Sequence, residues 1–187
     1  MDIGMGAWII LGILGLIVLW AIVTFNRMIV LRNRIDNAWS QVDVQLRRRY
    51  DLIPNLVEIV KGYAAHERET FEEVTKARQA GIDARTVEDQ AQAENLITGA
   101  LRRLFAVAEA YPQLRATENF MHLQEELAGT ESKIAYARQF YNDSALTYHN
   151  LIQSLPPRII ANMGGFKARD YFEIEDPEAR GPVKVEF

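Results

Sequence analysis

Residues 7–25 read AWIILGILGLIVLWAIVTF, an apolar run that decides how the rest of the chain is understood. No charged side chain occurs from Ile3 to Phe25. At ~1.5 Å of rise per residue the run would be roughly 28 Å long as a helix, close to the ~30 Å hydrocarbon core of a bilayer. A helix without a polar face has no side to turn to water on a soluble protein. The run therefore predicts a transmembrane helix.

A cleaved signal peptide is the alternative to a retained anchor. Such a peptide needs a basic n-region, an apolar core of about 7–15 residues and a small-residue cleavage site. Here the n-region, MDIGMG, contains Asp2 and no Lys or Arg, the apolar run is longer, and no A-x-A pattern follows it. These features favour a retained, single-pass anchor.

The charges that flank the run predict its orientation. No Lys or Arg precedes it, whereas Arg27, Arg32 and Arg34 follow it closely. The positive-inside rule then places the N-terminus on the outer, extracytoplasmic side of the membrane and the body of the chain in the cytoplasm. Trp8 and Trp20 lie near the two ends of the run, where indole rings favour the membrane interface. We expect these five residues to lie at the membrane interfaces.

The composition of the remaining chain excludes several classes of function. All 21 Lys and Arg residues follow the apolar run, together with every Asp and Glu except Asp2, so the body is close to neutral. General nucleic-acid binding needs a basic surface, which this balance does not favour. The chain has no cysteine, which excludes disulfides, thiolate catalysis and zinc sites built on cysteine.

Apolar residues recur at helical spacing throughout the body. Met28, Leu31 and Ile35 begin a stripe that steps by three and four residues, and neither Gly nor Pro occurs between Gly15 and Pro54. The first helix is therefore predicted to continue from the membrane to about residue 50. Three further long helices are predicted at about 52–79, from a Thr86-x-x-Asp89 capping box to about 110, and from a Thr117 cap to a point before Pro156.

The predicted fold is all-α, an N-terminal transmembrane helix that continues into an antiparallel bundle of three or four long helices. The boundaries are a short extracytoplasmic N-terminus at 1–6, the span at 7–25, a cytoplasmic bundle at 26–155 and an irregular tail at 156–187. The one strand-like alternation, Val183–Phe187, is too short to stand alone.

Two long blocks of sequence resemble a known family. Residues 38–78 include the run RRRYDLIPNLVEIVKGY, and residues 111–142 read YPQLRATENFMHLQEELAGTESKIAYARQFYN, with ARDYFE near the end. Together they resemble the LemA family of bacterial membrane proteins over nearly all of the chain. The resemblance implies a short N-terminal segment, one span of the cytoplasmic (inner) membrane and a cytoplasmic long-helix bundle. The LemA family also includes relatives associated with magnetosome membranes. The sensor kinase that shares the name is unrelated, and this chain has no kinase motif.

Charged residues interrupt the apolar stripes at a few positions. Arg47–Arg49 form a basic cluster that would suit either a phosphate or lipid headgroup or acids on a neighbouring helix. Glu131 and Arg138 lie seven residues apart on one face of the last long helix, where charges usually fix register. We favour a structural polar network, whose expected members are Asp43, Arg47, Arg48, Arg49, Glu131 and Arg138.

Metal and catalytic sites receive little support. His66-x-x-Glu69 and His122-x-x-Glu125 place a histidine and an acid at i,i+3, but di-iron bundles use the reverse order, Glu-x-x-His. No catalytic residue, metal or cofactor is therefore predicted, and a hydrolase is the least favoured function.

The function predicted is that of a non-enzymatic, membrane-anchored scaffold that associates with copies of itself and organises or shapes the membrane. The alternative is an adaptor that recruits or regulates another membrane protein, such as a protease or a signalling protein. The expected partners are the lipid bilayer, other copies of the chain and, for the adaptor, that membrane protein; nucleic acid is not expected.

Overall fold

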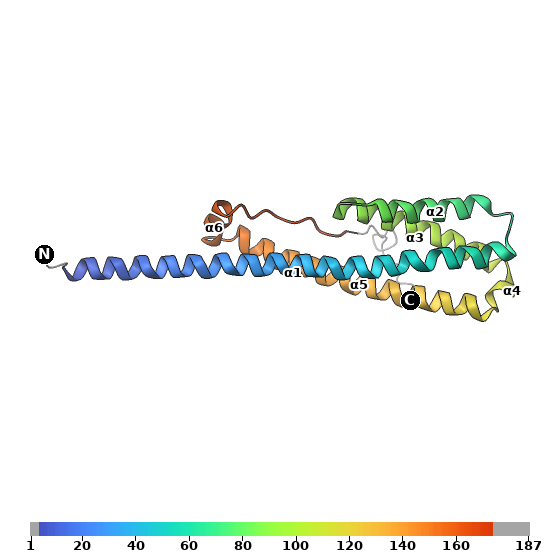
Figure 1. Ribbon diagram of the computed structural model, residues 1–187, viewed down its shortest axis with the longest axis horizontal. Helices are drawn as coiled ribbons and strands as arrows, with labels where there is room; N and C mark the ends of the chain where they lie inside the picture. Colours follow the sequence, from blue (N-terminus) through green and yellow to red (C-terminus); the bar gives the residue numbers. More distant parts are fainter. Residues whose placement is uncertain (1–3, 174–187) are drawn as a thin grey trace, which may run out of the picture. The chain divides into compact units, whose positions relative to one another are not determined.

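The fold is all-α, as the periodicity predicts. The computed structural model describes residues 4–173, and within that range it has six helices and no strand (Figure 1). The helices are α1 (Met5–Tyr63), α2 (Arg68–Asp83), α3 (Val87–Glu109), α4 (Pro112–Arg115), α5 (Glu118–Gln153) and α6 (Pro157–Met163). The strand-like residues 183–187 lie outside the described part of the chain.

The described chain divides into two compact units, and the two long helices α1 and α5 contribute to both. The first unit contains residues 4–40 and 140–169, and the second contains residues 41–139 and 170–173. Helix α1 is continuous for 59 residues and joins the apolar run to the second unit without a break. This continuity agrees with the absence of Gly and Pro between residues 15 and 54.

The second unit is a four-helix arrangement built from the later part of α1, from α2 and α3, and from the early part of α5. A capping box starts α3, because the Thr86 hydroxyl accepts from the Asp89 N–H and the Asp89 carboxylate accepts from the Thr86 N–H. Apolar side chains from all four helices form the core. They include Val42, Leu46, Ile53, Leu56, Val60, Phe71, Val74, Ile97, Leu101, Leu104, Phe120, Leu127 and Ile134.

The first unit packs the end of α5 and helix α6 against the early part of α1. The Trp39 and Tyr141 rings make an edge contact with centroids 5.3 Å apart, and Phe25 meets Phe166 at the same separation. Met28, Leu31, Ile35, Tyr148 and Ile152 are buried. Residues 5–23 of α1, by contrast, expose nearly all of their apolar side chains.

The structure differs from the predicted helix boundaries at Pro54. This residue lies inside α1, which ends at Tyr63, and the break falls instead at residues 64–67. The proline removes one helical N–H and leaves the carbonyl of Tyr50, four residues earlier, without its usual donor. The Nε of Arg78 on α2 donates to that carbonyl at 2.7 Å, which explains how the helix tolerates the proline.

The tail also differs from its prediction as an irregular segment, because residues 157–163 form α6. Pro157 occupies the first helical position, where a missing N–H costs nothing. Gly165 follows with a φ of 68°, a left-handed conformation that glycine adopts without strain. After α6, Phe172 is fully buried and Phe166 is half-buried. The last long helix also ends earlier than predicted, at Gln153, so Leu155 lies beyond it and is 77% exposed.

Candidate functional site

The apolar run forms the N-terminal part of α1, and its side chains are directed away from the protein. Trp8 is 65% exposed and Leu16 is 68% exposed, whereas Trp20, near the other end, is 40% exposed. Among the described helices, α1 alone is long and apolar enough to cross a membrane, and only 6% of its most apolar window is buried. An exposed apolar surface of this extent needs lipid or another apolar partner to cover it.

The three arginines that follow the run do not share one environment. Arg27 is exposed, whereas the Arg32 guanidinium carbon lies 5.7 Å from the centroid of the Phe166 ring. The Arg34 guanidinium carbon lies 5.1 Å from the Phe140 centroid. Such cation–π contacts stabilise an arginine at the protein surface by about 0.5–1 kcal/mol. Arg32 and Arg34 therefore contribute to the packing of the first unit. Their predicted position at the membrane interface is a separate role.

A buried polar network occupies the core of the second unit. Arg49 of α1 and Glu94 of α3 are 3% and 0% exposed, and Arg49 Nη1 donates to Glu94 Oε2 at 2.7 Å. The second amino group of Arg49, Nη2, lies 3.2 Å from Thr98 Oγ1 and 3.1 Å from Glu131 Oε2 on α5. One guanidinium thus joins three helices of this unit.

The adjacent residue of α1, Tyr50, extends the network toward the end of α2. Its hydroxyl donates to Glu94 Oε1 and accepts from Gln90 Nε2 at 2.6 Å. Gln90 Nε2 also lies 3.4 Å from the carbonyl oxygen of Gly81. The missing side chain of Gly81 leaves room for the Tyr50 ring, since a Cβ at this position would lie 2.6 Å from the Tyr50 hydroxyl oxygen.

Burial changes the acidity of this network. Desolvation by burial raises the pKa of the Glu94 carboxyl, and the Arg49 guanidinium opposes that rise. Burial also raises the pKa of the Tyr50 phenol, and the negative charge of Glu94 raises it further. Removing a buried ionised group's partner leaves a charge in a medium that solvates it poorly. Any packing of the helices that separates Arg49 from Glu94 is therefore unfavourable, so the pair is suited to fixing how these helices pack.

The other predicted members do not contact this network directly. Arg47 pairs with Asp43 one turn earlier on α1, at 3.0 Å, and both side chains are largely exposed. Arg48 Nη2 lies 3.6 Å from Glu126 on α5. Arg138 is half-buried on α5, and the described residues provide no ion pair for it. The structure thus joins Arg49 and Glu131 directly, and it does not join Arg138 to them.

Sequence reasoning missed three residues at the centre of the network, Tyr50, Gln90 and Glu94. A signal for two of them was present, because Gln90 and Glu94 continue the α3 stripe of Ile97 and Leu101 at the same three- and four-residue steps. A glutamate in the middle of an apolar stripe indicates a buried partner. Tyr50 offered no such signal, since a tyrosine at a core position packs equally well without an acid beside it.

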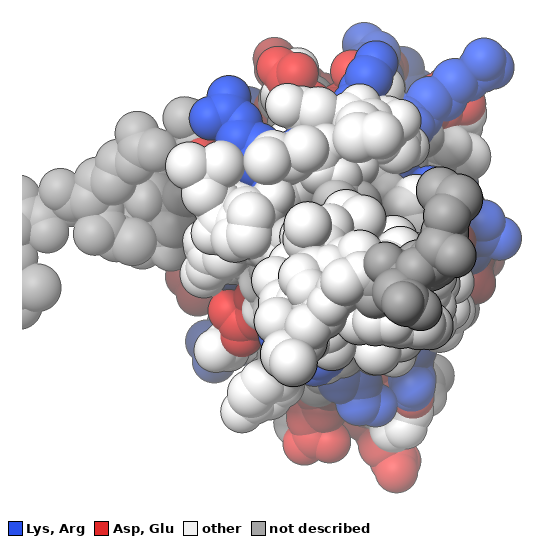
Figure 2. All heavy atoms as spheres, turned by 90° about the vertical axis from the view of Figure 1, so that its left-hand side faces the viewer, with Lys and Arg blue, Asp and Glu red and all other residues white. Residues whose placement is uncertain are grey.

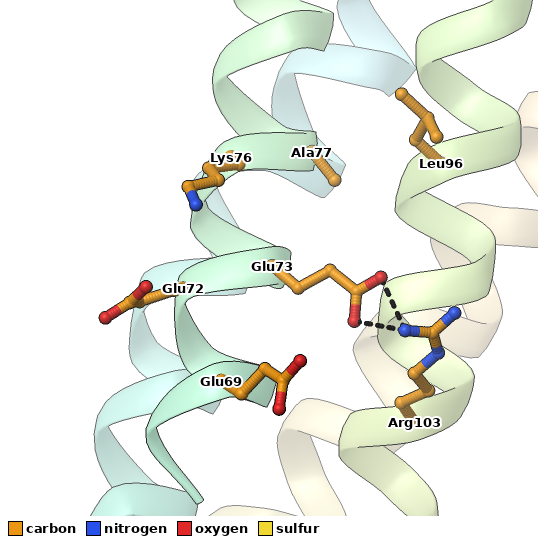
Figure 3. Close-up of a pocket in the computed structure, with 7 residues that line it drawn as sticks. All are labelled: Glu69, Glu72, Glu73, Lys76, Ala77, Leu96 and Arg103. Atoms are coloured by element: carbon orange, nitrogen blue, oxygen red, sulfur yellow. Dashed lines mark hydrogen bonds and ion pairs between the residues drawn. The ribbon is translucent and has the colours of Figure 1, made fainter.

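A groove between α2 and α3 is lined by several charged side chains of the second unit. It has a volume of about 350 Å³, and Figure 3 shows Glu69, Glu72 and Glu73 along α2 with Arg103 opposite on α3. Arg103 Nη1 lies 2.7 Å from both carboxylate oxygens of Glu73. The pair is largely exposed and connects two neighbouring helices, so its contribution to the stability of the bundle is about 1 kcal/mol or less.

The histidine motifs do not form a metal site in the described residues. His66 lies in the turn between α1 and α2 rather than on a helix, which removes the helical face that it was expected to share with Glu69. His122 and Glu125 are exposed on α5. Within residues 4–173 no three His, Asp or Glu side chains are grouped closely enough to hold a metal ion.

An all-helical chain with an exposed apolar helix at its N-terminus and an ion-paired helical core belongs to the class of membrane-associated helical proteins. The sequence pattern of the LemA family matches residues 38–187. The chain belongs to that family.

Curated relatives of the chain fall into two groups. Magnetosome protein MamQ 2 of Paramagnetospirillum magneticum is 26% identical over 185 residues, covering 85% of this chain and 68% of the relative. Magnetosome protein MamQ of Magnetospirillum gryphiswaldense is 25% identical with the same coverage. Protein LemA of Metamycoplasma hominis is 27% identical over 141 residues, covering 73% of this chain and 63% of the relative. These names point to a structural or membrane protein rather than to an enzyme.

Proposed function

We propose that the chain is a membrane-anchored scaffold that associates with copies of itself and organises the membrane in which it lies. The observation that carries the proposal is the continuity of α1, from Met5 to Tyr63. The same helix exposes its apolar side chains in residues 5–23 and buries an apolar stripe from Met28 to Val60. An anchor of this kind is continuous, as one helix, with the folded core, and is not a flexible tether.

The orientation that we propose follows from charge. Every Lys and Arg of the chain follows the apolar run, so the positive-inside rule places the N-terminus outside and the helical units in the cytoplasm. The membrane would be the inner membrane of a bacterium, crossed once. The magnetosome proteins among the relatives favour a role in organising a membrane.

The mass of the full-length protein in mild detergent tests self-association. We expect light scattering during gel filtration to give several copies per particle, and tomography of cells that overproduce the chain to show altered inner membranes. A particle that stays monomeric across concentration, in cells with unaltered membranes, would contradict the scaffold.

A pull-down from the same detergent extract separates the scaffold from an adaptor. Differently tagged copies should recover each other if the chain is a scaffold. Recovery of another membrane protein at a fixed ratio, without a second copy of the chain, would favour the adaptor and overturn our proposal. The charge-reversal variant Glu131→Lys shows how far self-association depends on the helical bundle. It places a like charge against Arg49 and leaves the membrane segment unchanged.

A further inference from the structure

Helix α6 presents an apolar face that the first unit leaves uncovered. Ile159 is 58% exposed and Met163 is 85% exposed, and Leu155, just before the helix, is 77% exposed. Ile159 and Met163 are four residues apart and therefore lie on one side of the helix. Ala161, on the other side, is buried. Helix α6 is thus anchored to the unit by one face and exposes apolar side chains on the other.

The position of α6 along α1 is fixed by direct contacts within the first unit. Phe166, just after α6, meets Phe25 with ring centroids 5.3 Å apart. A Cβ on Gly164 would lie 3.0 Å from the Phe25 ring, so the backbone of this turn passes directly against α1. Phe25 is the last residue of the apolar run. Helix α6 therefore lies at the level at which that run ends.

An apolar groove separates α6 from the last turns of the run. Its volume is about 450 Å³, and its walls are apolar or glycine residues from both helices: Ala21, Ile22, Phe25, Ile160, Met163 and Gly164. The α1 wall belongs to the surface that a bilayer would cover. The groove is continuous with that surface, and an acyl chain is the ligand that would already be present beside it.

The charges around α6 suit the border of a membrane. Arg158 of α6 and Lys167 just after it are exposed, and Arg27 of α1, two residues beyond the groove, is exposed as well. Seen from the N-terminal end of α1, the centre of the surface is uncharged, and both basic and acidic side chains border it (Figure 2). Basic residues at the edge of an apolar face favour anionic headgroups.

We propose that α6 is a second membrane-contacting element. It lies in the interface of the leaflet where the apolar run ends, places Leu155, Ile159 and Met163 among the acyl chains, and holds one acyl chain in the groove beside residues 21–25. The inference rests on the proposed membrane span. It adds a lateral contact that a single transmembrane helix does not have.

Spin labels on single cysteines test this contact, because the chain has no cysteine of its own. The full-length protein is prepared as Met163→Cys in vesicles of phosphatidylcholine and phosphatidylglycerol, and a nitroxide is attached. Collision rates are then measured with oxygen, which concentrates in lipid, and with a water-soluble nickel chelate. Two further labels give the limits: Leu16→Cys in the middle of the run, and Met121→Cys, an exposed methionine on α5 in the second unit.

The label at 163 should resemble the label at 16, with an oxygen-to-nickel collision ratio several-fold above that at 121. A ratio at 163 equal to that at 121, with lipid contact kept at 16, would overturn the inference and leave the proposed function standing. Water contact at 16 would instead remove the membrane span and the proposed function with it. Shielding of 163 from both reagents, with spin–spin broadening, would show that a second copy covers α6 and would also overturn the inference.

Discussion

At the scale of single residues, Arg49 has two acidic partners in different environments, and they should differ in their importance. Glu94 is fully buried, whereas the Glu131 side chain is 52% exposed. Glu94→Ala removes the buried partner and leaves the buried guanidinium only the half-exposed Glu131 as an acidic partner, so we expect it to lower the free energy of unfolding by about 3–5 kcal/mol. Glu131→Ala should lower it by about 1 kcal/mol or less. Urea unfolding followed by circular dichroism in detergent measures both, and equal losses would contradict the assigned burial.

The raised pKa of Glu94 also predicts a pH dependence. In the unfolded chain a glutamate titrates near pH ~4.3, whereas burial gives Glu94 a higher pKa in the folded protein. Between these two values the folded state binds more protons, so the free energy of unfolding falls as the pH rises through that interval. Glu94→Gln removes this contribution. Unfolding curves of both proteins from about pH 4 upward should therefore diverge with pH, and a constant difference would contradict the shift.

Gly81 and Gly99 provide a matched pair of helical glycines. A methyl group at Gly81 would meet the Tyr50 hydroxyl at 2.6 Å, whereas a methyl group at Gly99 would meet nothing within 4 Å. Gly99→Ala should raise the free energy of unfolding by roughly 0.5–1 kcal/mol, the helix propensity difference. Gly81→Ala should lower it by about 1–3 kcal/mol, because the Tyr50 ring must move. Thermal melts of the two variants should shift in opposite directions, and shifts of the same sign would contradict the packing described.

At the scale of elements, the Arg78 guanidinium replaces the hydrogen bond that Pro54 removes from α1. Arg78→Ala should lower the free energy of unfolding by about 1–2 kcal/mol, because it leaves the Tyr50 carbonyl without a donor. In a Pro54→Ala background the alanine N–H can serve that carbonyl, so the same substitution should cost less. A double-mutant cycle on urea unfolding measures the difference. Strictly additive effects would show that the two residues are not coupled through the carbonyl.

The same pair explains which helix boundaries the sequence could predict. The start of α3 was predictable, because its capping box is a local pattern of Thr86 and Asp89. The continuity of α1 through Pro54 was not, since the donor that permits it is Arg78, 24 residues later on another helix. The turn at 64–67 reads AAHE, residues that also suit a helix, so nothing local indicated the break. Boundaries set by tertiary contacts are not visible in local pattern.

Some features of the candidate site could likewise be predicted from the sequence, and others could not. The apolar run and its exposed surface follow from the pattern along the chain, and so does the expectation that an acid on a neighbouring helix faces Arg49. The partner itself did not follow, because pairing of α1 with α3 depends on how the helices are arranged in the second unit. Glu94 and Gln90 could be found as polar interruptions of the α3 stripe. Their joint contact with Tyr50 required the structure.

At the scale of the whole molecule, the scaffold proposal depends on the continuity of α1 between the apolar run and the second unit. Val30 tests this continuity, because its side chain is 64% exposed and few contacts are lost when it is replaced. Val30→Pro removes a helical N–H and introduces a clash with the preceding turn, at a local cost of about 3 kcal/mol or more. Helical content of residues 41–139 and insertion into the membrane should survive, since neither depends on residue 30.

Self-association and the change in membrane form should be lost in Val30→Pro, whereas Val30→Ala should behave as the original chain does. Light scattering in detergent and tomography of overproducing cells provide the two measurements. Normal assembly of Val30→Pro would mean that the helical units associate without a continuous anchor, and the observation that carries the scaffold proposal would no longer support it. Loss of assembly with insertion kept would show that the membrane segment acts through the helix that it shares with the bundle, rather than as an attachment alone.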